Sequence, residues 1–382
     1  MALKLARRGD VPPFMVMDVM AQAARLEAAG QAIVHLEVGQ PGSPAPAKVR
    51  ERAVKALGEE RLGYTLALGE STLRARIADH YQGRFGLAVD PERVVVTAGS
   101  SGGFQLLFTA LFEPGDRVAV PNPCYPAYRH MLTALGLVPV ALATDLDTGY
   151  QPLVAHLEHL EEPVEGLIVA SPSNPVGSML APLEFQALAQ YCHRQGIRLV
   201  SDEIYHGLSY GVPETVAVAV SPSAVSVNSF SKYFAMTGWR LGWMVVPEDC
   251  LRQIERLAQN FFICPSTVAQ RAAEVAFECG AELDQRVAGY AANRQKLLAE
   301  LPALGFERIA PADGAFYLYV DISAMAAHSG ELAHRLLLEA GVATTPGLDF
   351  DPHRGHRFLR LSYAGSGGDI EEALTRLARW RR

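Results

Sequence analysis

The chain has 382 residues, with 34 lysines and arginines against 41 aspartates and glutamates, so its formal net charge is -7. A chain of this length that is 49% hydrophobic and 20% charged can bury a large core, which excludes intrinsic disorder. The mild acidic excess gives no general affinity for nucleic acid, and no apolar run approaches the roughly 20 residues that span a bilayer. We therefore expect a soluble globular protein, of two domains by its length, with no nucleic-acid or membrane partner.

Five cysteines are widely spaced in the sequence and include no CxxC pair. This pattern argues against a disulfide framework or a zinc site and favours a reducing compartment. Near the start, Pro12 and Pro13 occupy the place where a signal peptide needs an apolar stretch. We expect a cytoplasmic protein without a metal.

The first predicted elements are two amphipathic helices, near 49–57 and 73–81, where apolar residues recur three and four apart. The middle of the chain then alternates helical stretches with short β-branched runs, which predict buried strands at 93–97, 117–120, 166–170 and 197–201. One such helix, with apolar residues from Leu183 to Cys192, ends at Gly196. Alternating strands and helices predict a mostly parallel sheet covered on both faces, with ligands bound beyond the carboxyl ends of its strands.

The last third of the sequence has a different pattern. An alanine-rich stretch at 267–301 predicts one long helix, followed by a strand at 314–320, a helix at 331–340 and a strand at 357–363. A final amphipathic helix has Asp369 and Glu372 at the spacing of a capping box. These elements predict a smaller α+β domain.

The most informative segment is 229–242, SFSKYFAMTGWRLG. Lys232 follows a strand-like run in an aromatic neighbourhood, where desolvation lowers the pKa of an amine and makes it a nucleophile toward aldehydes. Ser229, Ser231 and Arg240 could hold a phosphate, because arginine offers a planar fork for such an anion. Alone, an SxSK segment is more often a surface lysine in a serine-rich loop, but the glycine-punctuated GWRLG tail makes that interpretation weaker.

This segment resembles the Schiff-base lysine motif of the class I/II aminotransferases, the pyridoxal-phosphate enzymes of fold type I. Motifs from Gly39 to Arg360 follow the order of that family, so the resemblance covers nearly the whole chain. It implies an α/β fold whose large domain, at 46–279, contains a mostly parallel seven-stranded sheet covered by helices. It implies a smaller α+β domain formed by 1–45 and 280–382.

Two loops after predicted strands offer partners for the cofactor ring. Asp202 closes a buried strand, and its carboxylate could pair with a protonated pyridine nitrogen, while Tyr205 could donate to the phenolic oxygen of the ring. Asn174 lies in the loop SPSNPVG, which resembles the family's Asn-Pro-Thr-Gly loop, and the resemblance gives it contacts with cofactor and substrate. We expect the Asn174–Pro175 bond to be cis. Val176 replaces the usual threonine, which removes a hydroxyl.

Two further turns offer a phosphate cradle and a stacking surface. The turn TAGSSGG leads from a strand into a helix, and such a helix start is a ready anion site. The resemblance assigns the cofactor phosphate to the residues Ser100 and Ser101. In the proline-pinned loop PNPCYPAY, Tyr125 could lay its aromatic face against a planar heterocycle, and it matches the family's stacking residue.

The remaining matches concern the substrate and a second subunit. By resemblance, Gly39 offers its backbone N–H to the substrate carboxylate, which Arg360 grips through a bidentate pair. Tyr64 matches a tyrosine that reaches the cofactor phosphate of the neighbouring subunit. The resemblance therefore implies a homodimer with a shared active site, with Lys232, Asp202 and Tyr205 as the catalytic residues.

The implied function is an amino-acid aminotransferase that moves an amino group between an L-amino acid and a 2-oxo acid through a pyridoxal 5'-phosphate Schiff base on Lys232. The chief alternative is a pyridoxal-phosphate-dependent carbon–sulfur β-lyase, which would share every cofactor contact. A non-catalytic sensor would need an attached DNA-binding module, for which motifs beginning at Gly39 leave no room. The sequence leaves the donor and acceptor open, as well as the effect of Phe350-Asp351, where Phe-Gly is usual in the family.

Overall fold

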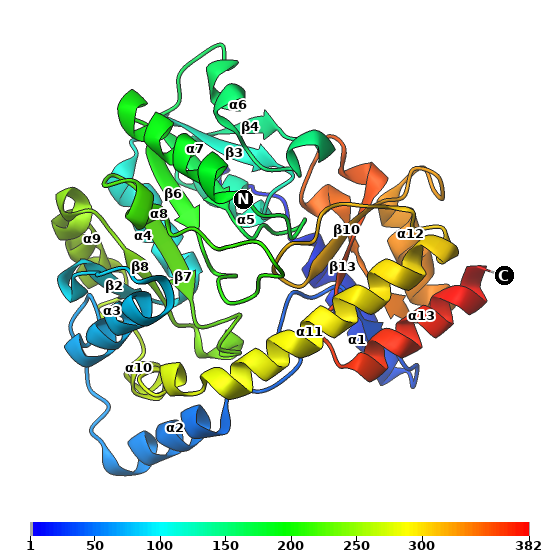
Figure 1. Ribbon diagram of the computed structural model, residues 1–382, viewed down its shortest axis with the longest axis horizontal. Helices are drawn as coiled ribbons and strands as arrows, with labels where there is room; N and C mark the ends of the chain where they lie inside the picture. The colour runs from blue at the N-terminus through cyan, green and yellow to red at the C-terminus, as the bar shows by residue number, and fades with distance from the viewer. Residues whose placement is uncertain (1–2, 382) are drawn as a thin grey trace.

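The computed structural model describes residues 3–381, which form two units, each built on its own β-sheet. The larger unit contains a seven-stranded sheet and the smaller unit a four-stranded sheet. Helix α11 (Gly280–Glu300) runs from the larger unit along the smaller one (Figure 1).

The larger sheet is mostly parallel, as predicted. One strand, β8, runs antiparallel to both of its neighbours, β2 and β7, and the other adjacent pairs are parallel. In spatial order the strands are β2 (Val94–Thr97), β8 (Gly242–Val245), β7 (Val225–Ser229), β6 (Arg198–Asp202), β5 (Gly166–Ala170), β3 (Arg117–Asn122) and β4 (Val138–Ala143).

The strands of this sheet are apolar on both faces because helices cover both. Along β2, Val94 and Val96 pack into one core cluster, whereas Val95 packs into another. Along β5, Ile168 shares the cluster of Val95, while Val169 faces the opposite layer. Since successive side chains of a strand point to opposite faces, unbroken apolar runs are what a doubly covered sheet requires.

Two sets of helices supply this cover, three on one face and the rest on the other. The first set is α4 (Gly99–Leu111), α5 (Pro126–Ala134) and α9 (Glu248–Phe261). The second set is α2 (Ala47–Glu59), α3 (Ser71–Phe85), α6 (Val154–Glu158), α7 (Pro182–Gln195), α8 (Ala217–Val220) and α10 (Thr267–Ala273). Short 3-10 helices lie between these elements, namely η2 (Pro91–Arg93), η3 (Leu146–Thr148), η4 (Thr237–Trp239) and η5 (Ala276–Glu278).

The smaller unit is built from segments near both ends of the described chain. Its strands form the antiparallel order β12 (Thr345–Pro346), β13 (Phe358–Ser362), β10 (Tyr317–Asp321), β9 (Arg308–Ile309), and a parallel pair, β1 (Val34–His35) with β11 (Val342–Ala343). Its helices are α1 (Met15–Ala28), α11, α12 (Ser329–Arg335), the π-helix η7 (Leu336–Ala340) and α13 (Gly367–Arg381), with the 3-10 helices η1 (Arg7–Gly9), η6 (Leu301–Leu304), η8 (Gly347–Asp349) and η9 (Gly355–Arg357).

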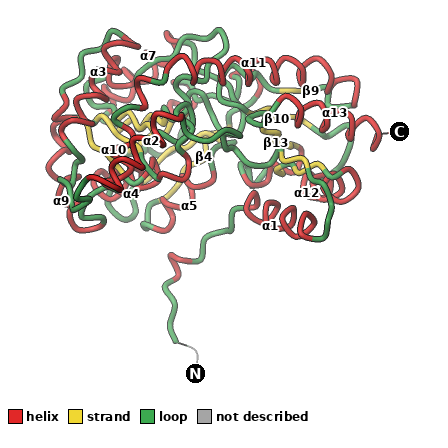
Figure 2. Tube along the Cα trace, turned by 90° about the horizontal axis from the view of Figure 1, so that it is seen from below, coloured by secondary structure: helices red, strands yellow, loops and turns green. Residues whose placement is uncertain are grey.

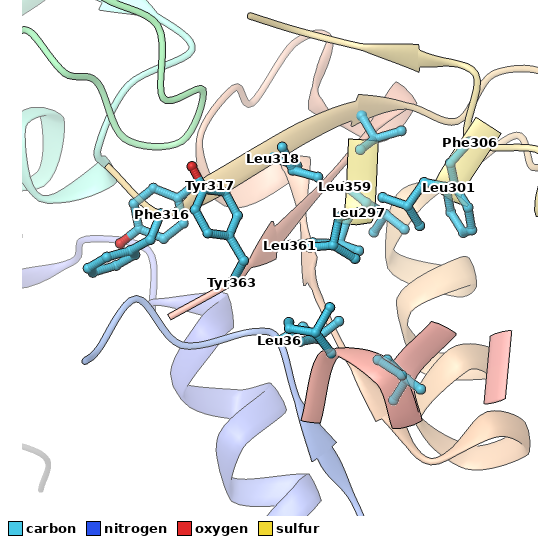
Figure 3. Packing of buried hydrophobic residues seen from close by; sticks show 14 of the residues in the cluster. Leu36, Leu297, Leu301, Phe306, Phe316, Tyr317, Leu318, Leu359, Leu361 and Tyr363 are labelled. Atoms are coloured by element: carbon cyan, nitrogen blue, oxygen red, sulfur yellow. The ribbon is translucent and has the colours of Figure 1, made fainter. Parts of the chain in front are cut away.

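A core of leucines and aromatic residues holds this unit together (Figure 3). Leu318 and Leu359, from β10 and β13, are fully buried with Leu297 of α11. Burying a leucine side chain contributes about 1.5–3 kcal/mol. Residues 3–10 are instead exposed, on the stretch that leads to the N-terminal end of the chain (Figure 2), whereas Phe14 packs on Tyr125.

The predicted helix at 267–301 is wrong as a single element, because α10 ends at Ala273 and α11 begins at Gly280. Between them the side chain of Phe277 packs with its ring centroid 5.6 Å from that of Phe230 and 5.2 Å from that of Phe234. Packing of Phe277 into this aromatic cluster, together with the low helix propensity of glycine, interrupts the helix.

The capping box of the last helix also lies one turn earlier than its predicted position. The Asp369 N–H donates to Ser366 Oγ at 3.1 Å, and the Ser366 N–H donates to the Asp369 carboxylate at 3.0 Å. Glu372 instead accepts from Arg376. Among residues 3–381, no helix combines the length and the apolar character needed to cross a membrane.

Candidate active site

The carboxyl ends of β2, β3, β5, β6 and β7 lie at one edge of the larger sheet, beside a cavity of about 400 Å³ that faces the smaller unit. The predicted site residues that line it are Gly39, Ser100, Ser101, Tyr125, Asn174, Asp202, Tyr205, Ser231, Lys232, Arg240 and Arg360. Ser229 lies just behind this wall, with its hydroxyl 2.9 Å from Ser231 Oγ. Tyr64 does not line this cavity.

Lys232 lies in the loop that follows β7 and points its amine into the cavity. Its Nζ donates to the Gly39 carbonyl oxygen at 2.6 Å. Burial and the nearby positive charge of Arg360 lower the pKa of this amine to about 8, although Asp202 favours the charged form. A larger neutral fraction near neutral pH makes Lys232 a better nucleophile than an ordinary lysine.

Asp202, the last residue of β6, is buried at the floor of the cavity. Burial raises the pKa of its carboxyl to about 6, although hydrogen bonds from the Tyr128 hydroxyl and the Ile204 N–H partly offset the effect. A buried carboxylate in this position needs a cationic partner, which a protonated heterocycle would supply.

Tyr128 was not predicted as a site residue, although it lines the cavity. It lies in α5, three residues after Tyr125, and the two rings meet edge to face with centroids 5.4 Å apart. The signal in the sequence was the spacing of the two tyrosines, which puts both on one face of a helix that starts at Pro126. Tyr128 orients the Asp202 carboxylate from below Tyr125.

The start of α4 lies at one end of the cavity. Gly99 has φ +69°, and a Cβ on this residue would lie 2.5 Å from Arg240 Nη2. Only glycine therefore lets the Arg240 guanidinium lie against the first residue of α4. A helix N-terminus, serine hydroxyls and an arginine together suit a phosphate.

Arg360 lies at the opposite end of the cavity, on β13. It is 4% exposed, donates to Asn174 Oδ1 at 2.9 Å and to the Glu37 carbonyl at 2.5 Å, and its Nε has no partner. The rings of Tyr317 and Phe350 lie 4.4 and 4.6 Å from its guanidinium carbon. The unpartnered Nε of a buried guanidinium suits a carboxylate ligand.

Tyr205 and Tyr317 join the two ends of the cavity, since their hydroxyls lie 2.7 Å apart. A Cβ on Gly39 would lie 1.7 Å from the Tyr317 hydroxyl, so this position needs glycine. Tyr317 was not predicted as a site residue. It comes from β10, 112 residues after Tyr205, and only the pairing of the two units brings it here.

An apolar wall completes the cavity and was also missed. Phe14 packs edge to face on Tyr125, with ring centroids 5.6 Å apart, and α1 adds Val16, Met17 and Met20. Asp349 accepts from the backbone N–H groups of the first turn of α1, Met15 and Val16, at 3.1 and 3.3 Å. The apolar pattern of α1 alone gave no sign that it faces a site.

The Asn-Pro loop has the predicted cis bond between Asn174 and Pro175. Val176, which stands where the family usually has threonine, is 1% exposed and packs with Ala310 and Tyr319 of the smaller unit. Val176 therefore forms part of an apolar contact between the units. Asn174 still accepts a hydrogen bond from Arg360.

An amine, a buried carboxylate, a tyrosine ring and a helix start beside an arginine surround one cavity, and these are the kinds of group that a pyridine aldehyde phosphate requires of its ligands. The carboxylate with a raised pKa and the space kept open by Gly99 fit this group in particular. Fold and site together define a pyridoxal-phosphate enzyme of fold type I.

Comparison with known proteins supports the same class of enzyme. Residues 31–377 match the family model described as aminotransferase class I and II. The chain is 48% identical over 381 residues to the valine–pyruvate aminotransferase of Mycobacterium tuberculosis, covering 99% of this chain and 98% of that protein. The crystal structure of an aminotransferase from Mycobacterium tuberculosis superposes with a TM-score of 0.98 at 48% identity and covers 99% of each chain. The structure of the aspartate aminotransferase from Thermus thermophilus with maleate superposes with a TM-score of 0.93 at 33% identity, over 99% of this chain and 100% of that one.

The chain belongs to the class I and II aminotransferase family. It is an amino-acid aminotransferase that depends on pyridoxal 5'-phosphate. These findings favour transamination over the carbon–sulfur lyase alternative.

Proposed function

We propose that the amino donor is an aliphatic L-amino acid of the valine type and that the acceptor is a small 2-oxo acid such as pyruvate. The apolar wall of Phe14, Val16, Met17, Met20 and Phe350 carries this proposal, because it offers an aliphatic side chain an apolar surface. The name of one relative, valine–pyruvate aminotransferase, gives the same donor and acceptor for that protein.

The charges in the cavity support an apolar donor. Among the described residues that line it, the lysines and arginines are Lys232, Arg240 and Arg360. The first is the cofactor amine, the second belongs to the phosphate end and the third to the α-carboxylate. No lining cation of this chain is left for the distal carboxylate of aspartate or glutamate.

Each polar residue has a distinct part in the proposed reaction. Bound pyridoxal phosphate supplies an electron sink. Arg360 and Asn174 hold the substrate carboxylate, so that the bond to the α-hydrogen faces Lys232. The Lys232 amine, with its lowered pKa, takes the α-proton and later returns a proton. Asp202 would pair as a carboxylate with the protonated ring nitrogen of the cofactor, and Tyr205 would donate a hydrogen bond to its ring oxygen.

A panel of amino donors tests the substrate proposal. Valine, leucine, alanine, phenylalanine and aspartate are each assayed with pyruvate and with 2-oxoglutarate, and the Lys232→Ala variant serves as the blank. We expect the highest kcat/KM for an aliphatic donor with pyruvate. A preference for aspartate or phenylalanine of more than tenfold over valine would contradict the proposal.

We also propose a homodimer in which Tyr64 completes the phosphate end of the partner's site. Tyr64 is 83% exposed and does not line the cavity of its own chain, and Leu66 beside it is 67% exposed. Leu3 and Leu5 are 90% and 87% exposed on the stretch that projects from the body (Figure 2). Apolar side chains this exposed suit burial against a second copy.

Light scattering tests the dimer, which should have twice the chain mass of 41.3 kDa. Tyr64→Phe should then release pyridoxal phosphate about tenfold more readily on dilution, because one phosphate hydrogen bond is lost. Tyr191→Phe, on α7, is the matched control and should behave as wild type. A monomer that retains full activity would refute the shared site.

For the domain limits we propose 46–279 for the larger domain and 1–45 with 280–382 for the smaller one. The parallel pairing of β1 with β11, which joins residue 34 to 342, supports the assignment of the N-terminal segment. We propose a cytoplasmic location, which is supported by five cysteines that are all free thiols. Fractionation of cells that express the tagged chain tests it.

A further inference from the structure

The segment from Asp349 to Arg354 links the two units beside the cavity. Its central residue, Asp351, stands where the family usually has glycine and is 1% exposed. Asp351 Oδ1 accepts from the Asn122 side-chain amide at 2.8 Å and from the N–H groups of His353 and Arg354, both at 2.9 Å. Burial raises the pKa of this carboxyl, but the hydrogen bonds from the Arg354 and His353 N–H groups and the Arg354 guanidinium more than offset it, so the pKa lies below its ordinary value.

Arg354 completes a polar connection across the boundary. Its Nε donates to Asp351 Oδ2 at 3.0 Å, and its Nη2 donates to the carbonyl oxygens of Asn122 at 2.6 Å and Thr144 at 2.9 Å. Asn122 is the last residue of β3, and Thr144 directly follows β4, the neighbouring strand of the larger sheet. We call Asn122, Asp351 and Arg354 the Asp351 clamp.

Backbone contacts extend the clamp toward the cavity. Arg129 of α5 donates to the Phe350 carbonyl at 2.8 Å and to the Asp349 carbonyl at 3.1 Å. The Cys124 N–H donates to the Phe350 carbonyl at 3.2 Å. The segment is therefore fixed to the loop that carries the stacking Tyr125.

The residues next to Asp351 face the substrate end of the cavity. The Phe350 ring lies 4.6 Å from the Arg360 guanidinium, and the Asp349 carboxylate receives the first turn of α1. A displacement of this segment would thus move the aromatic cover of Arg360 and the apolar wall together. The same displacement would shift them relative to Tyr125.

We propose that Asp351 is a positioning residue for transamination: through Asn122 and Arg354 it fixes the substrate-carboxylate site on Arg360 relative to the cofactor site on the larger sheet. The proposal rests on the proposed role of Arg360. It explains the Phe350-Asp351 departure as a connection between the units. A glycine in this place lacks the carboxylate. Of the hydrogen bonds in the clamp, only the two from Arg354 to backbone carbonyls do not depend on that carboxylate.

Asp351→Asn and Asn122→Ala test the proposal in the holoenzyme. In Asp351→Asn the new amide faces either Arg354 Nε or the three donors at Oδ1, so one side of the clamp loses its acceptor. Asp321→Asn is the matched control, because Asp321 also accepts from a local backbone N–H and from an arginine, Arg357, but within the smaller unit. Arg360→Lys reports on the substrate site itself.

The measurements are the Kd of 3-methylbutanoate, an unreactive apolar carboxylate, by calorimetry, the KM and kcat for valine, and the Tm. For Asp351→Asn we expect Kd and KM to rise about tenfold, which corresponds to ~1.4 kcal/mol, with kcat changed much less. Asn122→Ala should act in the same direction, and the double variant should lose less than the product of the two effects. Asp321→Asn should leave Kd unchanged.

Three outcomes separate the possibilities. If Asp351→Asn lowers Tm but leaves Kd and KM as in wild type, the clamp is only structural and the inference is wrong. If Asp321→Asn raises Kd equally, the effect is not specific to the clamp and the inference is wrong. If Arg360→Lys leaves Kd unchanged, the proposed carboxylate site itself fails.

Discussion

The two ends of the active-site cavity are built in different ways. At the proposed cofactor end, Ser100 and Lys232 closely follow strands of one mostly parallel sheet, and Asp202 is the last residue of another of its strands. At the substrate end, Arg360 is held by the carbonyl of Glu37 and the side chain of Asn174, which lie 323 and 186 residues away in the chain. The cofactor end is thus formed by the ends of neighbouring strands, whereas the substrate end is formed where the two units meet.

This difference affects how each end tolerates change. Residues at strand ends are positioned by backbone hydrogen bonds of the sheet, so a substitution there removes a chemical group but leaves the frame in place. Residues at the substrate end are positioned by side chains from three distant segments. A substitution there should alter binding of the substrate before it alters the chemistry.

Lys232→Ala should have the largest effect, because it removes both the cofactor amine and the proton carrier. We expect kcat for transamination to fall by about 10⁴-fold or more. Lys296→Ala, which removes an exposed lysine paired with Glu371, is the control and should retain full activity. Residual activity of Lys232→Ala above one per cent would mean that the cofactor end does not depend on this amine.

Arg360→Lys tests the substrate end with a charge-conserving change. Lysine cannot form the bidentate pair or fill the space between Tyr317 and Phe350, so KM for the amino donor should rise roughly 10- to 100-fold. The absorbance of the bound cofactor should stay as in wild type. Arg357→Lys, on an arginine that pairs with Asp321 at 3.2 Å, should change neither quantity.

Met20→Ala probes the apolar wall. Loss of three heavy atoms from the cavity lining should lower kcat/KM for valine by about tenfold, with a smaller effect on alanine, whose side chain is too short to use that surface. Met15→Ala is the matched control on the same helix, because Met15 is 37% exposed and does not line the cavity. Equal losses for valine and alanine would argue against a contact with the donor side chain.

A prediction on stability rather than activity concerns Asp202 in the cofactor-free protein. Its folded pKa of about 6 lies above the ordinary value of 3.8, so its contribution to stability is complete below pH 3.8 and is lost as the pH rises through 6. Between pH 4 and 7, wild type should therefore lose roughly 2–3 kcal/mol relative to Asp202→Asn.

Urea unfolding of both proteins at several pH values in this range measures the difference. A constant gap between wild type and Asp202→Asn would show that the burial of this carboxyl costs nothing. Addition of pyridoxal phosphate should remove the pH dependence of the gap, since the protonated ring supplies the missing positive charge.

Residues in local motifs could be predicted from the sequence, and residues brought in by packing could not. Asp202, Lys232 and Ser100 follow apolar strand patterns, and the order of those patterns places them at one edge of the sheet. Tyr317 and Met20 lie in ordinary apolar patterns that look the same whether they face a core or a cavity. The break in the helix at Phe277 was missed for the same reason, because an aromatic cluster outside the local sequence determines it.

By itself, then, the sequence determined the sheet, the cofactor chemistry and the amine on Lys232, because strand periodicity and strand-end motifs act over a few residues. Only the tertiary structure decided which groups surround Arg360 and which apolar side chains line the cavity. The partners of Arg360, the bond between Asp351 and Asn122 and the bond from the Met15 N–H to Asp349 join segments that lie up to 334 residues apart, and such distances carry no local pattern. Long-range packing, which no sequence period encodes, selected them.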